Sequence, residues 1–262
     1  MLTIVIIVPL IKYYYKIKTM KILIHYLLAI ALTLVSHNKS FAQFKKVKGN
    51  GNVTTKSHTT SDYHKVDVVG FMNIQLEKGT EGTIRVTTDE NIHEYVSVES
   101  NEGVLKIKIK SNVNISTKKG LHITVPFNDL DNVSLTGSGD ILTKDQIKSD
   151  QFEAEIKGSG DMILDIDVNR LDAKLTGSGD LKITGTATDL EIKVTGSGDF
   201  DGGSLISQNV EAYVSGSGDA SVVAKNSIKA RINGSGDIDY SGNPSKSNNK
   251  VMGSGDISAN KL

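Results

Sequence analysis

From Gly137 to its C-terminus, the chain repeats one tetrapeptide, Gly-Ser-Gly-Asp, at an almost constant spacing. The seven copies begin at Gly137, Gly158, Gly177, Gly196, Gly216, Gly234 and Gly253. A period of about 19 residues that is this regular indicates one structural unit stacked on itself, in which each copy buries a face against the next. The repeat therefore constrains the fold far more than it constrains the chemistry.

Within each copy, apolar and polar residues alternate with the period of two that is typical of a β-strand. The residue two positions before the tetrapeptide is apolar in every copy: Leu135, Ile156, Leu175, Val194, Val214, Ile232 and Val251. Immediately after it the residues are again apolar: Ile141, Met162, Leu181, Phe200, Ala220, Ile238 and Ile257. The same alternation predicts that both glycines of the tetrapeptide point inward and that its Ser and Asp point outward. We expect a polar turn at Gly185–Asp189 to interrupt it.

These columns predict an all-β fold, a parallel β-solenoid whose coils of about 19 residues each hold two or three short strands. Neighbouring coils would lie about 4.8 Å apart. The glycines would allow the chain to bend at the corner of each coil, where a Cβ would collide with the coils on either side. A β-sandwich is the alternative, but hairpin turns do not explain identical tetrapeptides at a constant step.

Residues 43–132 are also rich in strand patterns, although they are less regular. Alternating runs occur at Met72–Glu77, Thr83–Thr87, Tyr95–Val98, Val104–Lys110 and Leu121–Val125. We expect a short helix at Asp89–Tyr95, and we expect Pro126 to end the last run because proline cannot donate to a strand ladder. Residues 43–132 are predicted to form an N-terminal β lobe, the opening coils and cap of the regular solenoid at 133–262. A separate small β domain is the alternative.

The segment 1–42 has the pattern of an export signal. Lys21 precedes an apolar run from Ile22 to Val35, and a polar stretch follows that ends in Ser40-Phe41-Ala42. Small residues at 40 and 42 match a signal-peptidase site, so we expect cleavage before Gln43. The segment 1–42 is therefore predicted to be a leader, with Met20 as an alternative start. A membrane anchor is the competing interpretation, but the apolar run Leu2–Ile11 is too short to span a bilayer.

Composition excludes several classes of function. The chain has no cysteine, so it has no disulfide, thiolate metal site or catalytic cysteine. Removing the five lysines of the leader leaves 25 basic and 30 acidic residues, a net charge of −5. An acidic surface argues against a nucleic acid partner and an anionic membrane. We expect neither nucleic acid binding nor membrane insertion once the leader is removed.

An ordered set of motifs resembles a known family. The segment Val66–Ile74 is followed by Lys78-Gly79, by Val104–Ile107, by Ile123–Pro126 and by Leu135–Asp140. Together they are similar to the head GIN domain, the auto-transporter adhesin family common in Bacteroidetes. The resemblance covers most of residues 60–260 and implies a secreted right-handed parallel β-helix with a role in adhesion or surface binding. It implies no catalytic residue and no established ligand, and from the sequence we expect no translocator barrel of the kind that an autotransporter needs.

The outward residues of the tetrapeptides should form two rows along the solenoid. One row holds Ser138, Ser159, Ser178, Ser197, Ser217, Ser235 and Ser254. The other row holds Asp140, Asp161, Asp180, Asp199, Asp219, Asp237 and Asp256. Carboxylates about 5 Å apart repel by roughly 1 kcal/mol in water. We expect local hydrogen bonds to offset this repulsion, from the backbone amides two residues on or from the neighbouring Ser hydroxyl. An alternative is that calcium acts as a cofactor and bridges the aspartates of successive coils. A third interpretation is that the serine row binds sugars or a surface partner.

The sequence carries no catalytic motif. Carboxylate pairs such as Glu153/Glu155 have the spacing of any acidic strand face, and the histidines lack metal-ligand spacing. The tetrapeptide is not a nucleophile elbow, because the third glycine position and the following helix are missing. We predict no catalytic, cofactor-binding or established metal-binding residue.

We therefore expect a non-catalytic, exported β-solenoid of the periplasm, the outer surface or the extracellular space. Its repeated polar face would bind a surface ligand, a glycan or a protein, through many equivalent contacts. A structural protein that stacks end to end through the coil Val251–Ile257, forming a homo-oligomer, is the alternative. A polysaccharide-active enzyme is the third class.

Overall fold

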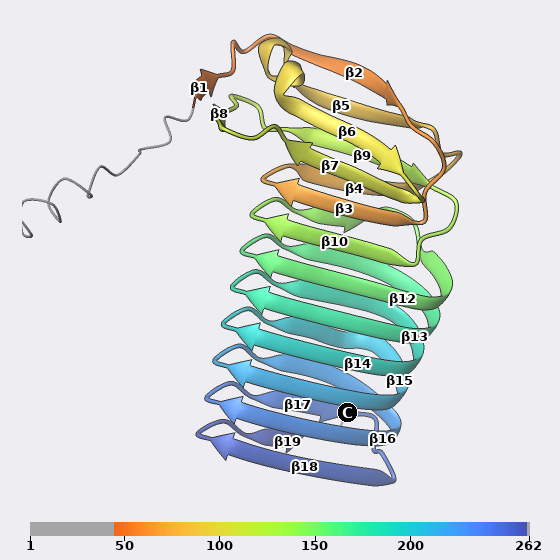
Figure 1. The fold of residues 1–262 in the computed structure, drawn as a ribbon. Helices are drawn as coiled ribbons and strands as arrows, with labels where there is room; N and C mark the ends of the chain where they lie inside the picture. Colours follow the sequence, from red (N-terminus) through yellow and green to blue (C-terminus); the bar gives the residue numbers. More distant parts are fainter. Residues whose placement is uncertain (1–44, 261–262) are drawn as a thin grey trace, which may run out of the picture. The chain divides into compact units, whose positions relative to one another are not determined.

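The computed structural model describes residues 45–260. These residues form a β-solenoid, in which successive coils stack on one another through parallel strand pairing (Figure 1). The regular part contains β10 (Asn132–Gly137), β11 (Ile141–Thr143), β12 (Ile147–Gly158), β13 (Met162–Gly177), β14 (Leu181–Gly196), β15 (Phe200–Gly216), β16 (Ala220–Gly234), β17 (Ile238–Ser241), β18 (Lys246–Gly253) and β19 (Ile257–Ala259). Each pairs in parallel with the equivalent strand of the next coil, and the first glycines of successive tetrapeptides lie in register, Gly158 beside Gly177 and Gly177 beside Gly196. The predicted β-solenoid, with one coil for each tetrapeptide repeat, is confirmed.

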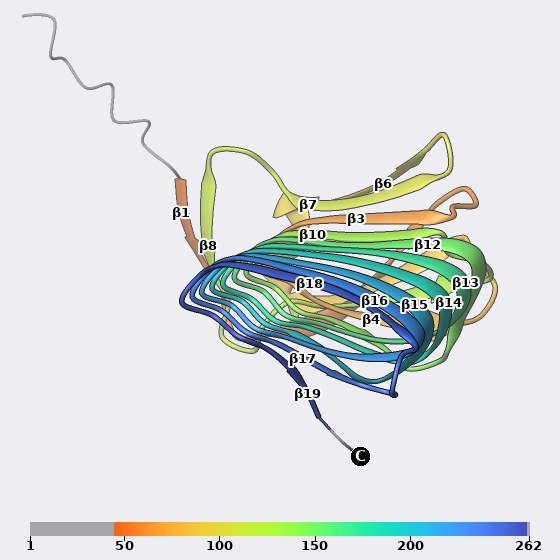
Figure 2. The ribbon, with the colours of Figure 1, turned by 90° about the horizontal axis from the view of Figure 1, so that it is seen from below.

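Each central coil is one long curved strand, which corrects two expectations. The predicted turn at Gly185–Asp189 is wrong, because these residues lie inside β14 and pair with Ile166–Arg170 of β13. The coil therefore does not divide into two or three short strands there. The backbone stays in strand conformation around the corner because the same corner of the neighbouring coil lies beside it. The N–H and C=O groups of the two corners can therefore hydrogen-bond to each other. In Figure 2, viewed along the stack, the strands curve around the interior in this way.

The core is a set of columns that run along the solenoid axis. Leu175 and Leu181, one on each side of a tetrapeptide, are 1% exposed, and the equivalent residues of the other inner coils are similarly buried. Burying one such side chain contributes roughly 1.5–3 kcal/mol. The predicted inward columns are confirmed up to the terminal coil, where Val251 is 38% exposed.

The N-terminal residues form coils that are out of sequence order. The strands are β2 (Val53–Thr59), β3 (Lys65–Gly70), β4 (Asn73–Lys78), β5 (Thr83–Asp89), β6 (Val96–Asn101), β7 (Val104–Ile109) and β9 (His122–Phe127). Strands β3 and β4 form one coil, which pairs with β10 and β11 on one side and with β7 and β9 on the other. The chain thus places its second coil outside the first and then returns past it to β10 (Figure 1).

Antiparallel strands cover the outer side of the β7–β9 coil. Strand β6 pairs with β7, whereas β5 pairs with β9 and carries β2 on its far side. The carboxylate of Asp89, which is fully buried, accepts hydrogen bonds from the backbone N–H groups of Gly51, at 2.5 Å, and Lys118, at 3.0 Å. These bonds hold the pKa of Asp89 below its ordinary value, that from Lys118 most strongly. One side chain thereby fixes two loops of the cover.

Two local predictions in this lobe have different outcomes. The expected helix is present as the 3₁₀ helix η1 (Glu90–Tyr95). The expectation that Pro126 ends its strand is wrong, because β9 continues to Phe127 and Pro126 pairs with Glu77 of β4. Proline is tolerated there because β5 pairs with β9 only from His122 to Thr124, so no antiparallel neighbour needs an N–H from residue 126.

A separate two-stranded sheet joins β1 (Lys45–Lys48) to β8 (Val113–Ser116). Ile115 of β8 packs with Ile92 and Tyr95 of the η1 region in a small satellite cluster. The predicted leader lies outside the described residues. Within residues 45–260 there is no helix with the length and apolar character needed to cross a bilayer.

Candidate functional site

The tetrapeptides form one corner of the solenoid, where backbone packs on backbone. The N–H groups of Ser178 and Gly179 both donate to the carbonyl of Gly158 in the preceding coil, at 2.9 and 3.3 Å. A Cβ added to Gly179 would lie 2.0 Å from the carbonyl oxygen of Gly160, so no other residue fits without moving a coil. Gly177 has a φ of +131°, which L-residues rarely adopt. The glycines therefore serve the stacking of the coils.

The serines and aspartates of the tetrapeptides are exposed, and we call this row of side chains the tetrapeptide edge. Each aspartate carboxylate from Asp140 to Asp237 accepts a hydrogen bond from the backbone N–H of the aspartate in the following coil. The distances range from 3.3 Å for Asp161 N–H on Asp140 to 2.7 Å for Asp256 N–H on Asp237. The expected bond within the same turn is thus replaced by one between coils. This amide contact offsets the repulsion between neighbouring carboxylates.

The tetrapeptide edge begins one coil earlier than the sequence motif does. Gly70 lies in register with Gly137, so that Gly70-Phe71-Met72-Asn73 occupies the place of a tetrapeptide. Sequence comparison by identity misses this coil. The apolar residues Val68 and Ile74, at the column positions around it, are the signal that could have found it.

No cluster of three or more potential metal-ligating side chains occurs within residues 45–260. The aspartates form a line in which each contacts its neighbour through a backbone amide. Calcium along this line stays a prediction, and a calcium-dependent rise in melting temperature would be its test.

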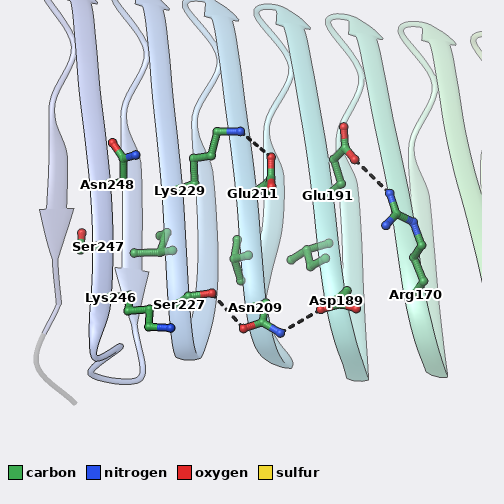
Figure 3. Close-up of a pocket in the computed structure, with 13 residues that line it drawn as sticks. Arg170, Asp189, Glu191, Asn209, Glu211, Ser227, Lys229, Lys246, Ser247 and Asn248 are labelled. Carbon is green, nitrogen blue, oxygen red and sulfur yellow. Dashed lines mark hydrogen bonds and ion pairs between the residues drawn. The ribbon is translucent and has the colours of Figure 1, made fainter.

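A second surface, on the strands that lead into the tetrapeptides, was not predicted. Two outward rows flank it, at seven and at five residues before each tetrapeptide from the second to the seventh, and we call them row −7 and row −5. Row −7 contains Gln151, Arg170, Asp189, Asn209, Ser227 and Lys246, and row −5 contains Glu153, Asp172, Glu191, Glu211, Lys229 and Asn248. Between them lies a hollow of about 510 Å³ from Arg170 to Asn248 (Figure 3).

A smaller hollow of about 320 Å³ continues along the same two rows toward the N-terminal coils. Lys65, Asn132 and Glu153 line it, and Arg170 lines both hollows. We call the two hollows together the trough. Its inner surface is formed by buried residues between the rows, among them Leu190, Val210 and Ile228.

The side chains of the trough bind one another across coils. Asn209 donates to the Asp189 carboxylate at 2.9 Å and accepts a hydrogen bond from Ser227 at 2.9 Å. Arg170 of row −7 reaches Glu191 of row −5 at 3.2 Å, so this ion pair crosses the trough (Figure 3). The planar carboxylate, amide and guanidinium groups are therefore held in place along both rows.

Two carboxyl groups of row −5 have pKa values below their ordinary range. A hydrogen bond from Lys174, at 2.6 Å, is the main cause for Glu153. Glu211 receives hydrogen bonds from Lys229 at 2.8 Å and from Tyr213 at 2.5 Å. Both carboxyls are thus held as anions, whereas a general acid in glycoside hydrolysis needs a raised pKa.

A third hollow, of about 400 Å³, lies on the opposite side of the tetrapeptide edge and close to its N-terminal end. Asp140 and Asp161 border it together with His122, which shows that part of the predicted aspartate row adjoins a cavity. Its apolar residues Leu142 and Ile163 pair in register and are 46% and 45% exposed. This patch is the most apolar part of the candidate surfaces described above.

Solved structures share this architecture. That of a "putative adhesin" from Bacteroides fragilis NCTC 9343 has a TM-score of 0.79 at 25% identity and covers 82% of this chain and 100% of that chain. That of a "putative lipid binding protein" from Parabacteroides distasonis ATCC 8503 has a TM-score of 0.69 at 29% identity, with coverages of 83% and 100%. A "putative adhesin" of the same strain, at 23% identity and a TM-score of 0.68, supports the fold alone. No curated protein matches the chain.

A family model described as "Putative auto-transporter adhesin, head GIN domain" matches residues 62–244, from just before β3 to the loop after β17. The match therefore includes the β3–β4 coil, the antiparallel cover strands β5 and β6, and six of the seven tetrapeptides. Because the model spans more than half of the sequence, the chain belongs to the head GIN domain family.

Proposed function

We propose that this chain is an exported, non-catalytic adhesin that binds a surface ligand through the tetrapeptide edge. The observation that carries the proposal is the repetition of an exposed Ser–Asp pair at the same position of every tetrapeptide coil. Successive pairs are about 4.8 Å apart because the coils are stacked in parallel. A ligand with its own repeat can contact several pairs at once.

Repetition matters because each contact is weak. An exposed serine hydroxyl contributes one hydrogen bond, which is worth about 0.5–1.5 kcal/mol net. Several equivalent contacts on a rigid support raise the overall affinity by avidity, since each contact after the first is intramolecular. The glycine packing beneath the edge supplies the rigidity, because the backbone of each tetrapeptide is hydrogen-bonded to the preceding coil.

A non-catalytic role is supported by the electrostatics of the carboxyl groups. The pKa values of Glu99, Glu153, Asp167, Asp201 and Glu211 all lie below their ordinary range, in each case mainly because of a hydrogen bond from a neighbouring side chain. These carboxylates are stabilised as anions and are poor proton donors near neutral pH. Export is supported by the leader pattern in the sequence and by the adhesin description of the family.

The test compares serines of the edge with serines elsewhere. Ser159, Ser178 and Ser197 are changed together to Ala, and the control changes Ser204, Ser221 and Ser245, which lie outside the tetrapeptides. Binding to immobilised polysaccharides and mucin-type glycoproteins is measured by biolayer interferometry. We expect at least about tenfold weaker binding for the edge variant alone. Equal binding by both variants, or no binding by the unaltered protein, would contradict the proposal.

A second candidate function is the binding of an apolar ligand such as a lipid tail. The exposed pair Leu142 and Ile163 favours it, and the relative from Parabacteroides distasonis carries a lipid-binding description. Extraction of the purified protein and mass spectrometry would detect a bound lipid. The double change Leu142→Ser and Ile163→Ser should abolish its retention, while Leu142→Met and Ile163→Met should preserve it.

A further inference from the structure

We infer that the trough between row −7 and row −5 is a binding site for a neutral, unbranched polysaccharide chain that runs along the solenoid axis. This inference goes beyond the proposed function, because it assigns a ligand class to a second surface that lies apart from the tetrapeptide edge.

The orientation of the trough excludes recognition by strand addition. It crosses β13 to β16 and β18, and its direction is perpendicular to these strands (Figure 3). From β13 to β16 the strands have a parallel neighbour on each side, so their backbone N–H and C=O groups are used within the sheet. An extended peptide that binds by β-augmentation needs an open strand edge. A ligand in the trough is therefore recognised by side chains.

The charges of the trough favour a neutral ligand. Its lining includes five cationic and six anionic side chains. Arg170 pairs with Glu191, Lys229 with Glu211 and Lys174 with Glu153. Because these opposite charges neutralise each other locally, an acidic polymer gains little attraction and would have to break existing pairs. A neutral ligand keeps the pairs and uses their remaining hydrogen-bonding capacity.

The chemistry of the rows matches a chain of hydroxyl groups. A hydroxyl both donates and accepts, and the rows offer fixed acceptors such as Asp189 beside fixed donors such as Asn209. The rows repeat once per coil, a spacing of about 4.8 Å, which is comparable to one sugar unit of an extended chain. The larger hollow, of about 510 Å³, falls in the range of about 300–1,000 Å³ that is usual for ligand sites.

Arg170 has a special place because it lines both hollows, and its ion pair with Glu191 crosses between the rows. A chain longer than one hollow passes directly over this guanidinium, which is about half exposed. Its N–H groups that do not contact Glu191 can donate to sugar oxygens on either side. Arg170 therefore joins the two hollows into one extended site.

The experiment measures binding of linear hexasaccharides to the intact protein by isothermal titration calorimetry. Neutral probes are cellohexaose, xylohexaose and mannohexaose; the acidic probe is hexagalacturonate, and an uncharged extended hexapeptide is the peptide probe. The trough variants are Asn209→Ala and Arg170→Ala. The matched control is Asn169→Ala, which also removes an Asn–Asp hydrogen bond between coils, to Asp150 at 2.7 Å, from a residue that lines neither hollow.

We expect at least one neutral hexasaccharide to bind, with affinity about tenfold lower in each trough variant and unchanged in Asn169→Ala. Failure of all neutral probes to bind, tighter binding of hexagalacturonate or the peptide, or undiminished binding by both trough variants would each overturn the inference. The triple Ser→Ala edge variant is an additional arm. Loss of sugar binding in that variant alone would support binding at the tetrapeptide edge and refute the trough. Loss only in the trough variants would support the trough and show that the tetrapeptide edge does not bind these sugars.

Discussion

The two ends of the solenoid are terminated in different ways. Toward the N-terminus, antiparallel strands β2, β5 and β6 cover the β7–β9 coil, and core residues such as Leu105 and Ile123 are at most 2% exposed. In the last described coil, all eight residues of β18 are exposed. There the inward columns change to polar residues, Ser247 after Ile228 and Asn249 after Ala230. One end is thus covered and the other is made polar.

This difference bears on the end-to-end stacking that the sequence allows as an alternative function. Growth through the N-terminal end would require displacing β2 and β6. Pairing through β18 would bring the polar residues Ser247 and Asn249 into a core, where each needs a hydrogen-bond partner. Lys246 and Lys250 on the same strand also oppose strand pairing. Stacking stays a prediction, and the polar columns weigh against it.

The largest expected effect comes from placing a methyl group at equivalent glycines near each end. A Cβ at Gly139 would lie 2.1 Å from the Met72 carbonyl oxygen, and one at Gly255 would lie 1.9 Å from that of Gly236. The coil of Gly139 is held between two others, so Gly139→Ala should destabilise the protein by more than about 4 kcal/mol or prevent folding. The terminal coil can move away, so Gly255→Ala should cost less than half as much. Urea unfolding measures both, and equal losses would show that the terminal coil is held as firmly as the inner ones.

Next in size is the loss of a core isoleucine from the same column. Ile123, beneath the cover, is 2% exposed, and Ile257, in the terminal coil, is only partly buried. We expect Ile123→Ala to lower the free energy of unfolding by about 2–5 kcal/mol. Ile257→Ala should lower it by about 1 kcal/mol or less, because less apolar surface is removed from contact. Chemical denaturation measures both losses, and they can be compared if the denaturant dependence of the unfolding free energy is unchanged. A larger loss for Ile257→Ala than for Ile123→Ala would refute the prediction.

A smaller effect is expected when the polar end is made apolar. The double change Ser247→Val and Asn249→Val continues the inward columns to the open end. Monomer stability should change by less than about 1 kcal/mol, since the side chains stay exposed. Self-association should appear in analytical ultracentrifugation, because the change exposes a contiguous apolar patch beside a free strand edge. The double change Ser247→Thr and Asn249→Ser provides the polar control and should leave the sedimentation unchanged.

The smallest effect concerns pH and the covered end. His93 is buried, and its Nε2 lies 3.1 Å from the Thr54 carbonyl oxygen. Burial lowers the pKa of His93, the Thr54 contact opposes this shift, and Lys56 and His58 add to it. At pH values between the lowered pKa of folded His93 and its ordinary value, the unfolded chain therefore binds more protons than the folded chain does. The stability contribution is present above a pH of about 6.5 and is lost as the pH falls toward the folded pKa.

We therefore expect the melting temperature of the unaltered protein to fall between pH 7 and pH 5. His93→Gln should flatten this decrease, whereas His122→Gln, at an exposed residue, should leave it in place. An identical pH profile for all three proteins would mean that His93 makes no contribution.

Much of the regular solenoid was predictable, because a period of two fixes which side chains point inward. Leu175 and Leu181 are buried for that reason. The corner at Gly185 was not predictable from local pattern, since turn-forming residues there become strand only when neighbouring coils satisfy their backbone groups. Pro126 illustrates the same dependence on strand neighbours. The alternation of apolar and polar residues also does not indicate that β7 and β9 lie outside β3 and β4.

The candidate surfaces divide in the same way. The serines and aspartates of the edge are exposed, as the alternation predicts. The trough was missed because row −7 changes chemistry at every coil, from Arg170 to Asp189 to Asn209. A signal was present in row −5, where Glu153, Asp172, Glu191 and Glu211 recur at one offset from the tetrapeptide. Row −5 alone does not identify a site, because row −7 and the hollow between the two rows are seen only when the coils are stacked.

The detour that places β7–β9 outside β3–β4 has a consequence for folding order. A polypeptide that emerges N-terminus first exposes Lys65–Lys78 before either of its neighbours has been made. This segment has bare edges on both sides until residues 104–127 and then 132–143 arrive, so formation of the first nucleus must wait for closure of a long chain segment. Every later repeat finds a finished template beside it and can add by propagation. From the order of the strands we therefore expect slow initiation at the N-terminal coils and faster addition of the later coils.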